Sequence, residues 1–301
     1  MNQKIKDAVM ASFVADALSL GVHWVYDVAA IESKYGRLEQ MVEPELAEYH
    51  KGKPKGALTH YGDQAYILLK SVSEHKGFDS GSFRQAWCKL FEDYSGYIDG
   101  ATKDTLNNIK NDKTIHVIGS MSSDLGGAAR ISPLALVFHN TLEGFISAAE
   151  DQTAMTHNHP AVIETARYFA RVAVNVFEGR SPVESMIEAM DQIPENSPVS
   201  GLVSKGLDSK GLPTRQTISQ FGQMCSVDVA LPSTIHLIAS YEDDLKTALI
   251  ENIMAGGDSS ARGLLAGFIL GAYLGLDQIP DQWLADMKAR YEIGILMDNI
   301  S

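Results

Sequence analysis

The strongest constraint on the fold is a glycine-framed helix start near the end of the chain. The segment Ala255–Arg262 places Gly256 and Gly257 directly before Asp258 and a long apolar run. Two glycines let the backbone bend sharply, so that another group can approach the start of this helix closely. Further glycines follow every four residues, at Gly263, Gly267, Gly271 and Gly275. This spacing copies a membrane dimerisation motif. However, the run 264–276 is shorter than the roughly 20 residues that span a bilayer, and we therefore predict a buried core helix.

Helical periodicity continues through most of the sequence, with apolar or small residues at i, i+3 and i+4. No sustained apolar–polar alternation occurs, and the one strand-like fragment is Thr114–Ile118. The pattern predicts an all-α chain of roughly ten to thirteen helices. It forms a single domain (1–301), because no linker or low-complexity tract divides it. The predicted helices are 5–19, 64–74, 82–94, 133–138, 141–150, 161–178, 182–191, 231–240, 244–254, 260–274 and 281–291. Longer loops, where binding groups collect, are expected at 23–27, 41–62, 118–130, 153–160 and 194–213.

The charge and the cysteines limit the class of protein. The formal net charge is −13 without a basic cluster, so nucleic-acid binding is not expected. An anionic ligand would need the local positive field of helix N-termini. Cys88 and Cys225 match no metal spacing, so we interpret them as reduced residues of the core in a cytoplasmic protein. We expect no signal peptide and no membrane span. The partner is then a small molecule or modified substrate, and the sequence leaves the oligomeric state open.

Two aspartates stand at predicted helix starts. Asp63 follows Tyr61-Gly62 and precedes Gln64, and Asp258 follows the glycine pair. Each is explained by helix N-capping alone, which stabilises a helix by about 1 kcal/mol. The alternative is that both helix starts converge and share one Mg²⁺, which prefers oxygen ligands and keeps several waters.

Two further loops contain candidate binding groups. Gly126 and Gly127 precede Arg130 in a small-residue loop, where backbone N–H groups and a guanidinium could hold phosphate. A simple tight turn explains the same glycines. His157 lies in the segment Thr156–Pro160, where the paired histidines lack a third ligand for zinc. A hydrogen-bonded structural loop, with a polar ligand contact, is the alternative.

Aromatic and titratable groups also gather after the first helix. The segment Val22–Asp27 contains His23, Trp24 and Asp27, which could line the floor of a pocket, although core packing of Trp24 explains it equally well. The loop Met41–Gly62 is locally basic in an acidic chain. It could cover a cleft and meet an anionic ligand, or remain a solvated loop. Its basic residues are His50, Lys51, Lys53, Lys55 and His60.

Taken in order, these motifs resemble the ADP-ribosylglycohydrolase family, which includes the J-type crystallins of jellyfish lens. The family opens with a Gly-Asp-Ala-Leu-Gly type helix, has a Thr-Asp-Asp-Thr motif, an Asn-Gly-Ala-Ala-Met-Arg type loop, a Leu-Thr-His-x-His-Pro motif, and ends with Gly-Gly-Asp-Thr-Asp-Thr. The matching segments here are Ala15–Gly21, Gly62–Ala65, Gly126–Leu134, Met155–Pro160 and Gly256–Ala261. Their order and spacing agree over residues 4–276.

The resemblance implies a compact orthogonal helical bundle with a central cleft, and hydrolysis of the bond between ADP-ribose and an acceptor. In the family, Thr and Asp side chains of the second and last motifs hold two magnesium ions. Here only Asp63 and Asp258 remain, while Gly62, Gln64 and Ser260 replace a Thr and two Asp, and Ala261 replaces the final Thr. Two carboxylates offset four positive charges poorly in a cleft, so we expect at most one weakly bound Mg²⁺.

The sequence therefore leaves two functions in view. One is a divergent hydrolase of an ADP-ribosyl or related N- or O-glycosidic bond, with reduced or no metal dependence, in which Asp63 and Asp258 are catalytic. The other is an inactive family member that binds ADP-ribose or a nucleotide, or is structural like the crystallins. A third possibility is that the cleft acts on another substrate and needs no metal. Expected substrate contacts come from His23, Asp27, His60, Gln64, Gly126, Gly127, Arg130, His157, Ser259 and Ser260.

Overall fold

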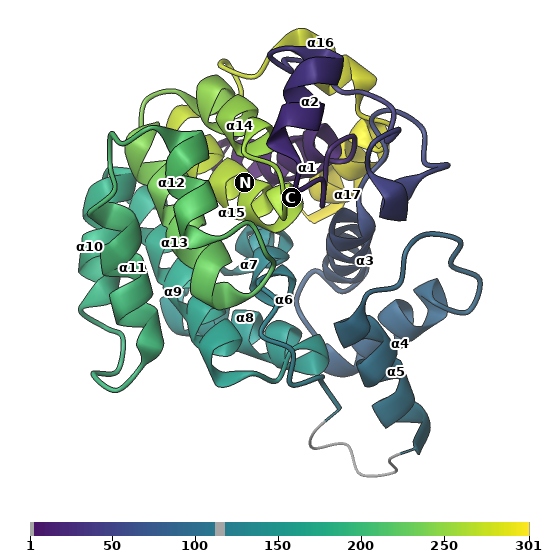
Figure 1. The fold of residues 1–301 in the computed structure, drawn as a ribbon. Coiled ribbons are helices and arrows are strands. Elements are labelled where there is room, and N and C mark those ends of the chain that lie inside the picture. Colours follow the sequence, from purple (N-terminus) through teal and green to yellow (C-terminus); the bar gives the residue numbers. More distant parts are fainter. Residues whose placement is uncertain (1–2, 112–117, 301) are drawn as a thin grey trace.

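The helix that follows the glycine joint lies inside the molecule, against the first helix of the chain (Figure 1). The computed structural model describes residues 3–111 and 118–300. Helix α15 (Ser259–Leu274) and helix α1 (Gln3–Ser19) pack along their length, and nearly every residue of both is buried. The glycines permit this close approach. A Cβ at Gly267 would lie 2.6 Å from the carbonyl oxygen of Ala11, and one at Gly271 would lie 2.5 Å from its Cβ.

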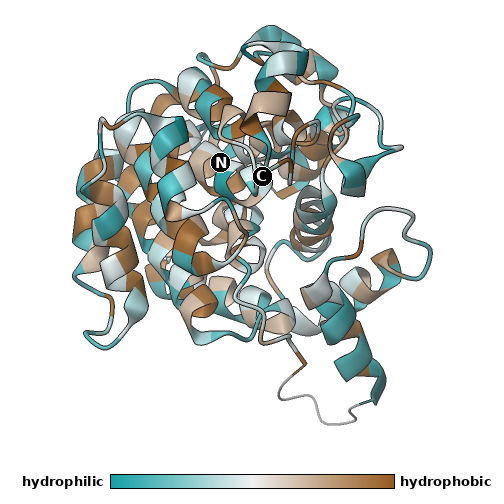
Figure 2. Cartoon of the chain, in the orientation of Figure 1, coloured by the Kyte–Doolittle hydropathy of each residue, from teal (hydrophilic) through white to brown (hydrophobic). Residues whose placement is uncertain are grey.

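The remaining helices surround this central pair (Figure 1). In Figure 2 the outer helices carry both hydrophilic and hydrophobic residues, as expected for elements with one face toward the core. The other elements are α2 (Val28–Tyr35), η1 (Glu48–His50), α3 (His60–His75), α4 (Ser80–Leu90), α5 (Gly100–Asn111), α6 (Gly126–Ala129), η2 (Ser132–Leu134), α7 (Ala135–Phe138), α8 (Leu142–Thr156), α9 (Pro160–Phe177), α10 (Pro182–Met190), α11 (Pro198–Leu207), α12 (Thr214–Phe221), α13 (Val227–Ser240), α14 (Leu245–Met254), α16 (Asp281–Asp286) and α17 (Arg290–Ile300).

The all-α prediction is confirmed, since the described residues contain no strand. The predicted number of helices is too low. Helices α5 and α12 are predominantly polar, and α11 contains two glycines and occupies half of the predicted loop 194–213. The loop predicted at 153–160 begins only after Thr156, and α16 and α17 replace one predicted helix. Residues 114–117 of the strand-like fragment lie outside the described residues. Cys88 and Cys225, expected in the core, are half-buried free thiols.

Three isolated backbone bridges hold the long loops together. They pair Val25 with Gly257, Ser120 with His157, and Asp124 with Ser226. The first includes two reciprocal contacts, Gly257 N to Val25 O at 2.8 Å and Trp24 N to Gly257 O at 2.8 Å. The loops that contain the sequence motifs are therefore fixed against one another. Among the described residues, no helix has both the length and the apolar character needed to cross a membrane.

The glycine contact between α1 and α15 gives a stability prediction. Gly271→Ala places a methyl group against Ala11 and should lower the free energy of unfolding by about 1–3 kcal/mol, the usual cost of overpacking. Gly201→Ala is the matched control, because Gly201 lies in α11 with open space around its Cα position. This control should be neutral or stabilising by up to about 1 kcal/mol. Urea unfolding measures both, and equal stability of the two variants would contradict the packing role.

Candidate functional site

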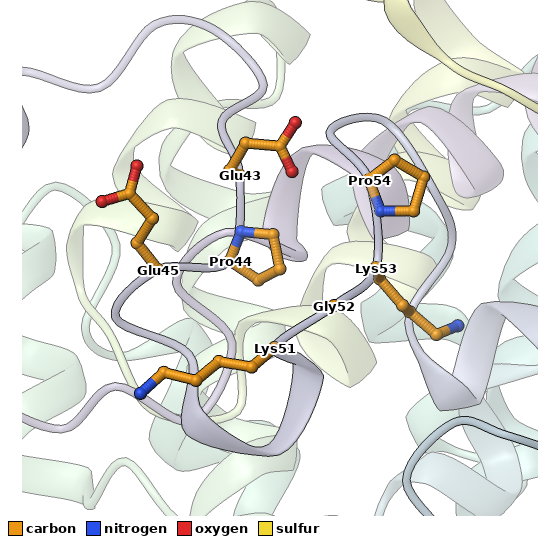
Figure 3. Close-up of a pocket in the computed structure, with 7 residues that line it drawn as sticks. All are labelled: Glu43, Pro44, Glu45, Lys51, Gly52, Lys53 and Pro54. Atoms are coloured by element: carbon orange, nitrogen blue, oxygen red, sulfur yellow. The ribbon is translucent and has the colours of Figure 1, made fainter.

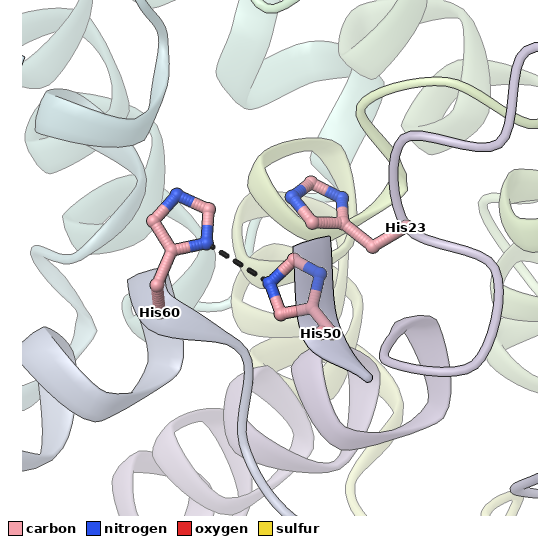
Figure 4. Close-up of side chains that lie close together, drawn as sticks. All are labelled: His23, His50 and His60. Carbon is pink, nitrogen blue, oxygen red and sulfur yellow. Dashed lines mark hydrogen bonds between the residues drawn. The ribbon is translucent and has the colours of Figure 1, made fainter. Parts of the chain in front are cut away.

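Three histidines from different parts of the chain meet at a buried point (Figure 4). His23 follows α1, His50 ends η1, and His60 opens α3. One ring nitrogen of each lies within 4.8 Å of the others. All three side chains are at most 2% exposed. The Nε2 of His50 and the Nδ1 of His60 are 3.2 Å apart and share a hydrogen bond. We call His23, His50 and His60 the histidine cluster.

Trp24 covers the histidine cluster in an unusual backbone conformation. Its φ angle is 61°, a region that bulky residues rarely occupy. The bridge between Val25 and Gly257 holds this turn in place. The indole stacks on His23 at a ring distance of 4.7 Å and lies 4.9 Å from His60. The strained turn therefore places a large aromatic ring directly over the histidines.

Helix-capping aspartates stand behind the histidines. Asp99 caps α5, since its Oδ1 accepts from Thr102 N at 2.6 Å, and its Oδ2 lies 3.4 Å from His60 Nε2. Asp258 caps α15 by accepting from Ala261 N, and the same Oδ1 lies 3.6 Å from His23 Nδ1. The capping interpretation of Asp258 is thus correct, and the residue faces the cluster as well.

Two members of the histidine cluster, His23 and His50, are uncharged at neutral pH. Burial, followed by the charges of His50 and His60, lowers the pKa of His23 well below 6.5. Burial, together with His60, lowers the pKa of His50 to about 2. Burial and the nearby Asp124 raise the pKa of Asp258 to about 8. Several buried polar atoms here have no hydrogen-bond partner, namely His23 Nε2, His50 Nδ1, His60 Nε2, Trp24 Nε1, Asp99 Oδ2 and Asp258 Oδ2.

A cleft of about 600 Å³ leads from the surface to His50. Its aromatic residues include Tyr49 and Tyr97, whose rings are 4.8 Å apart, and Tyr97 also contacts Trp24 edge-on. The whole lining is Tyr49, His50, Lys51, Gly52, Lys53, Asp63, Tyr94, Ser95, Gly96 and Tyr97. A second hollow of about 470 Å³ lies on the other side of the same loop and is lined by Glu43, Pro44, Glu45, Lys51, Gly52, Lys53 and Pro54 (Figure 3). The basic loop 41–62 thus forms a wall of the cleft.

Asp63 and Asp258 each have protein partners of their own. Asp63 lies in the first turn of α3, but the cap of that helix is Thr59. Its carboxylate accepts from Lys53 Nζ and from Tyr94 OH, and the side chain is 23% exposed. No hydrogen bond or ion pair joins it to Asp258 among the described residues, and neither belongs to the group that could hold a metal.

A different aspartate, Asp16, occupies the space beside Gly62. Its carboxylate accepts from Thr59 N at 2.8 Å, from Thr59 Oγ1 at 2.6 Å, and from Ser260 Oγ. A Cβ at Gly62 would overlap the Oδ2 of Asp16. A threonine at position 62 therefore does not fit. Ser260, at a position where the family carries an acid, is bonded to Asp16, and its backbone N donates to His23 Nδ1.

The predicted phosphate-binding loop is closed by internal contacts. Arg130 is 1% exposed and donates to Gln64 Oε1 and Thr156 Oγ1. A Cβ at Gly126 would overlap the ring of Tyr61, and one at Gly127 would lie 2.5 Å from the ring of His157. These glycines thus permit packing inside the protein.

The other predicted contacts are dispersed. Gln64 accepts from Trp87 Nε1 at 2.8 Å in addition to Arg130. His157 is buried and bonded to Thr156, while Ser259 is buried without a partner for its hydroxyl. Asp27 is exposed and caps α2 by accepting from Ala30 N at 3.0 Å. Of the predicted contacts, His23 and His60 lie in the cluster and Ser260 adjoins it.

The sequence interpretation missed the residues that complete the site. The sequence indicates His50 only as part of a basic loop, and it gives no indication of Asp99 or Tyr97, which precede the predominantly polar helix α5. A carboxylate directly before a glycine-led helical segment, as in Asp99-Gly100, is the one signal that could have indicated a cap. Its contact with His60 has no sequence signal.

The uncharged histidines predict acid-sensitive stability. The unfolded chain takes up protons near pH 6.5, whereas folded His23 and His50 do not until the pH is far lower. The free energy of unfolding should therefore fall as the pH drops from 6.5 towards 2, by about 1.4 kcal/mol per pH unit for each histidine. His50→Gln should remove about one proton from this slope, and His75→Gln, at an exposed position, is the matched control. Urea unfolding between pH 7 and pH 5 measures the slopes, and the same slope in both variants would contradict the assignment.

Comparison with known proteins gives the family. The family model described as ADP-ribosylglycohydrolase matches residues 1–301. Crystallin J1A of Tripedalia cystophora is 24% identical, covering 96% of this chain and 94% of the crystallin. ADP-ribosyl-[dinitrogen reductase] glycohydrolase of Rhodospirillum rubrum is 30% identical over 56% of this chain and 52% of its own length. A solved structure described as an ADP-ribosylglycohydrolase-related protein complex superposes with a TM-score of 0.78 at 20% identity, covering 99% of this chain and 96% of that one. The chain belongs to the ADP-ribosylglycohydrolase family.

Proposed function

We propose that this protein binds an ADP-ribose-like ligand in its cleft and does not carry out magnesium-dependent hydrolysis. The observation that carries this proposal is the set of contacts made by Asp63 and Asp258. Lys53 and Tyr94 donate hydrogen bonds to the carboxylate of Asp63, while Asp258 caps α15 and faces His23. Each carboxylate therefore already has partners within the protein, which supports a role other than holding magnesium.

The donor set at the end of the cleft does not fit magnesium. Mg²⁺ demands octahedral oxygen ligands, whereas imidazole nitrogens form the group of potential ligands. The family position at Gly62 cannot regain a threonine, because Asp16 fills that space. The proposed function therefore includes no step that depends on magnesium.

The cleft lining supports a ligand with an aromatic base and phosphate. Tyr49 is 51% exposed and lies against Tyr97, so the pair offers a ring surface for stacking. Lys51 and Lys53 line the same cleft and ion-pair with Glu48 and Asp63, so a phosphate group would compete with those carboxylates for the two lysines. The similarity to crystallin J1A extends over nearly the full length of both chains, which supports keeping a structural role in view.

A second candidate function is metal-independent hydrolysis, the divergent-hydrolase hypothesis. It is favoured by one specific observation, the pairing of buried Asp99 with His60 beside the cleft, at 3.4 Å. A carboxylate behind an imidazole orients it and stabilises its protonated form, as a general base requires. In this version His60 removes a proton from water, and Asp63 and Asp258 play no catalytic part.

Calorimetry with ADP-ribose, beside a release assay on ADP-ribosylated arginine and serine substrates, tests the proposal. We expect binding without Mg²⁺ and no turnover with or without Mg²⁺. Tyr97→Ala should weaken binding at least about 5-fold, because stacking on an aromatic side chain contributes about 1–3 kcal/mol per base. Tyr291→Ala, at a 77% exposed position in α17, should bind like the unmodified protein.

Three outcomes would change the conclusion. Turnover that requires Mg²⁺ would refute the proposal. Turnover without Mg²⁺ that His60→Gln abolishes would establish the second candidate function. Absence of ADP-ribose binding by the folded protein would exclude the nucleotide-binding role and leave a structural role like that of a crystallin.

A further inference from the structure

The histidine cluster has the dimensions of a small metal site. Two nitrogens on a tetrahedral zinc ion, each about 2.0–2.1 Å from it, lie roughly 3.3 Å apart. His50 Nε2 and His60 Nδ1 are 3.2 Å apart. The separations among the three potential ligand atoms stay within 4.8 Å, so an ion would need to draw the third ring inward by at most roughly 1.5 Å.

The far side of two of these rings faces a carboxylate. Asp99 Oδ2 lies 3.4 Å from His60 Nε2, and Asp258 Oδ1 lies 3.6 Å from His23 Nδ1. A histidine ligand in a metalloprotein usually donates its second N–H to such a group, which fixes the ring and makes the ligand more basic. Asp99 is placed to accept from His60 in this way, whereas the Nδ1 of His23 accepts from Ser260 N. Both carboxylates also cap helices, so their positions are rigid. Asp99 would offset part of the charge of one divalent ion.

Buried nitrogens in the cluster also lack partners. His23 Nε2, on the opposite edge of the ring from Asp258, has no hydrogen-bond partner, and neither has His50 Nδ1. Unsatisfied buried polar atoms are costly and rare in folded proteins. A change of tautomer at His50 would free its Nε2 lone pair.

From this geometry we propose that His23, His50 and His60 bind one transition-metal ion of the Zn²⁺ and Co²⁺ class. Imidazole is a preferred ligand for these ions, whereas Mg²⁺ and Ca²⁺ prefer oxygen. The cleft reaches His50, so water or a bound molecule can supply the fourth ligand, as in sites with three protein ligands. This site goes beyond the proposed function and does not depend on it.

Titration of the metal-stripped full chain with Co²⁺ and with Zn²⁺, without any nucleotide, tests the proposal. We expect one ion per chain, visible absorption from Co²⁺ of the intensity typical of tetrahedral ligation, and no displacement by excess Mg²⁺. His50→Gln should abolish stoichiometric binding, and His75→Gln, at an exposed position, is the control that should retain it. Asp99→Asn should weaken binding about 10- to 100-fold, as expected when the partner of a ligating histidine is removed.

Two results would overturn the proposal. One is absence of Co²⁺ and Zn²⁺ binding by protein that shows a cooperative thermal transition. The other is binding that neither His50→Gln nor Asp99→Asn alters, which would place the ion elsewhere. If His50→Gln fails to fold, X-ray absorption at the zinc edge of the unmodified protein decides the matter, because it counts imidazole ligands directly. Fewer than two imidazoles would refute the site. Since no nucleotide is present, failure here is distinct from failure of ADP-ribose binding.

Discussion

The site depends on one buried carboxylate, that of Asp16. Asp16 lies on α1 in the interior of the molecule. Its carboxylate accepts hydrogen bonds from Thr59, the cap residue of α3, and from Ser260 in the first turn of α15. Thr59 and Ser260 also contact one another at 3.0 Å. Burial raises the pKa of Asp16, and the hydrogen bonds from Ser260 and Thr59 oppose that shift. Three helices are therefore fixed at one point, and with them His23, which follows α1, and His60, which opens α3.

The sequence predicted the parts of this arrangement that depend on local geometry. The glycines of α15 indicated a close helix contact, and Gly256-Gly257-Asp258 indicated a capped helix start. Both follow from backbone sterics and short-range hydrogen bonding. The order of motifs also identified the fold, because it depends on spacing along the chain rather than on contacts. Local geometry and motif spacing did not predict that His23, His50 and His60 form a cluster.

The remaining parts depend on contacts between distant segments. His50 reaches His60 only because the loop 41–62 turns back over the start of α3, and that path leaves no periodic signal. Arg130 appeared suited to phosphate until the structure placed Gln64 and Thr156 around its guanidinium. The sequence does not show why position 62 is a glycine, because the atom that a Cβ there would overlap belongs to Asp16 on another helix. In each case the sequence gives the chemistry of a side chain, while tertiary packing decides which partner uses it.

Electrostatics explains where the charged and the neutral side chains lie around the site. Carboxylates that no metal neutralises are costly to bury, and in this chain Lys53 and Tyr94 satisfy Asp63 near the surface, while the buried point holds the neutral imidazoles of His23 and His50. Neutral histidines can be buried beside one another without a counter-ion, and Trp24 packs against His23 and His60. The turn at Trp24 costs about 1–3 kcal/mol of backbone strain, so it persists only because the bridge to Gly257 and the ring contacts hold it. A cluster held in this way keeps its geometry before any ligand arrives, which lowers the ordering cost of binding.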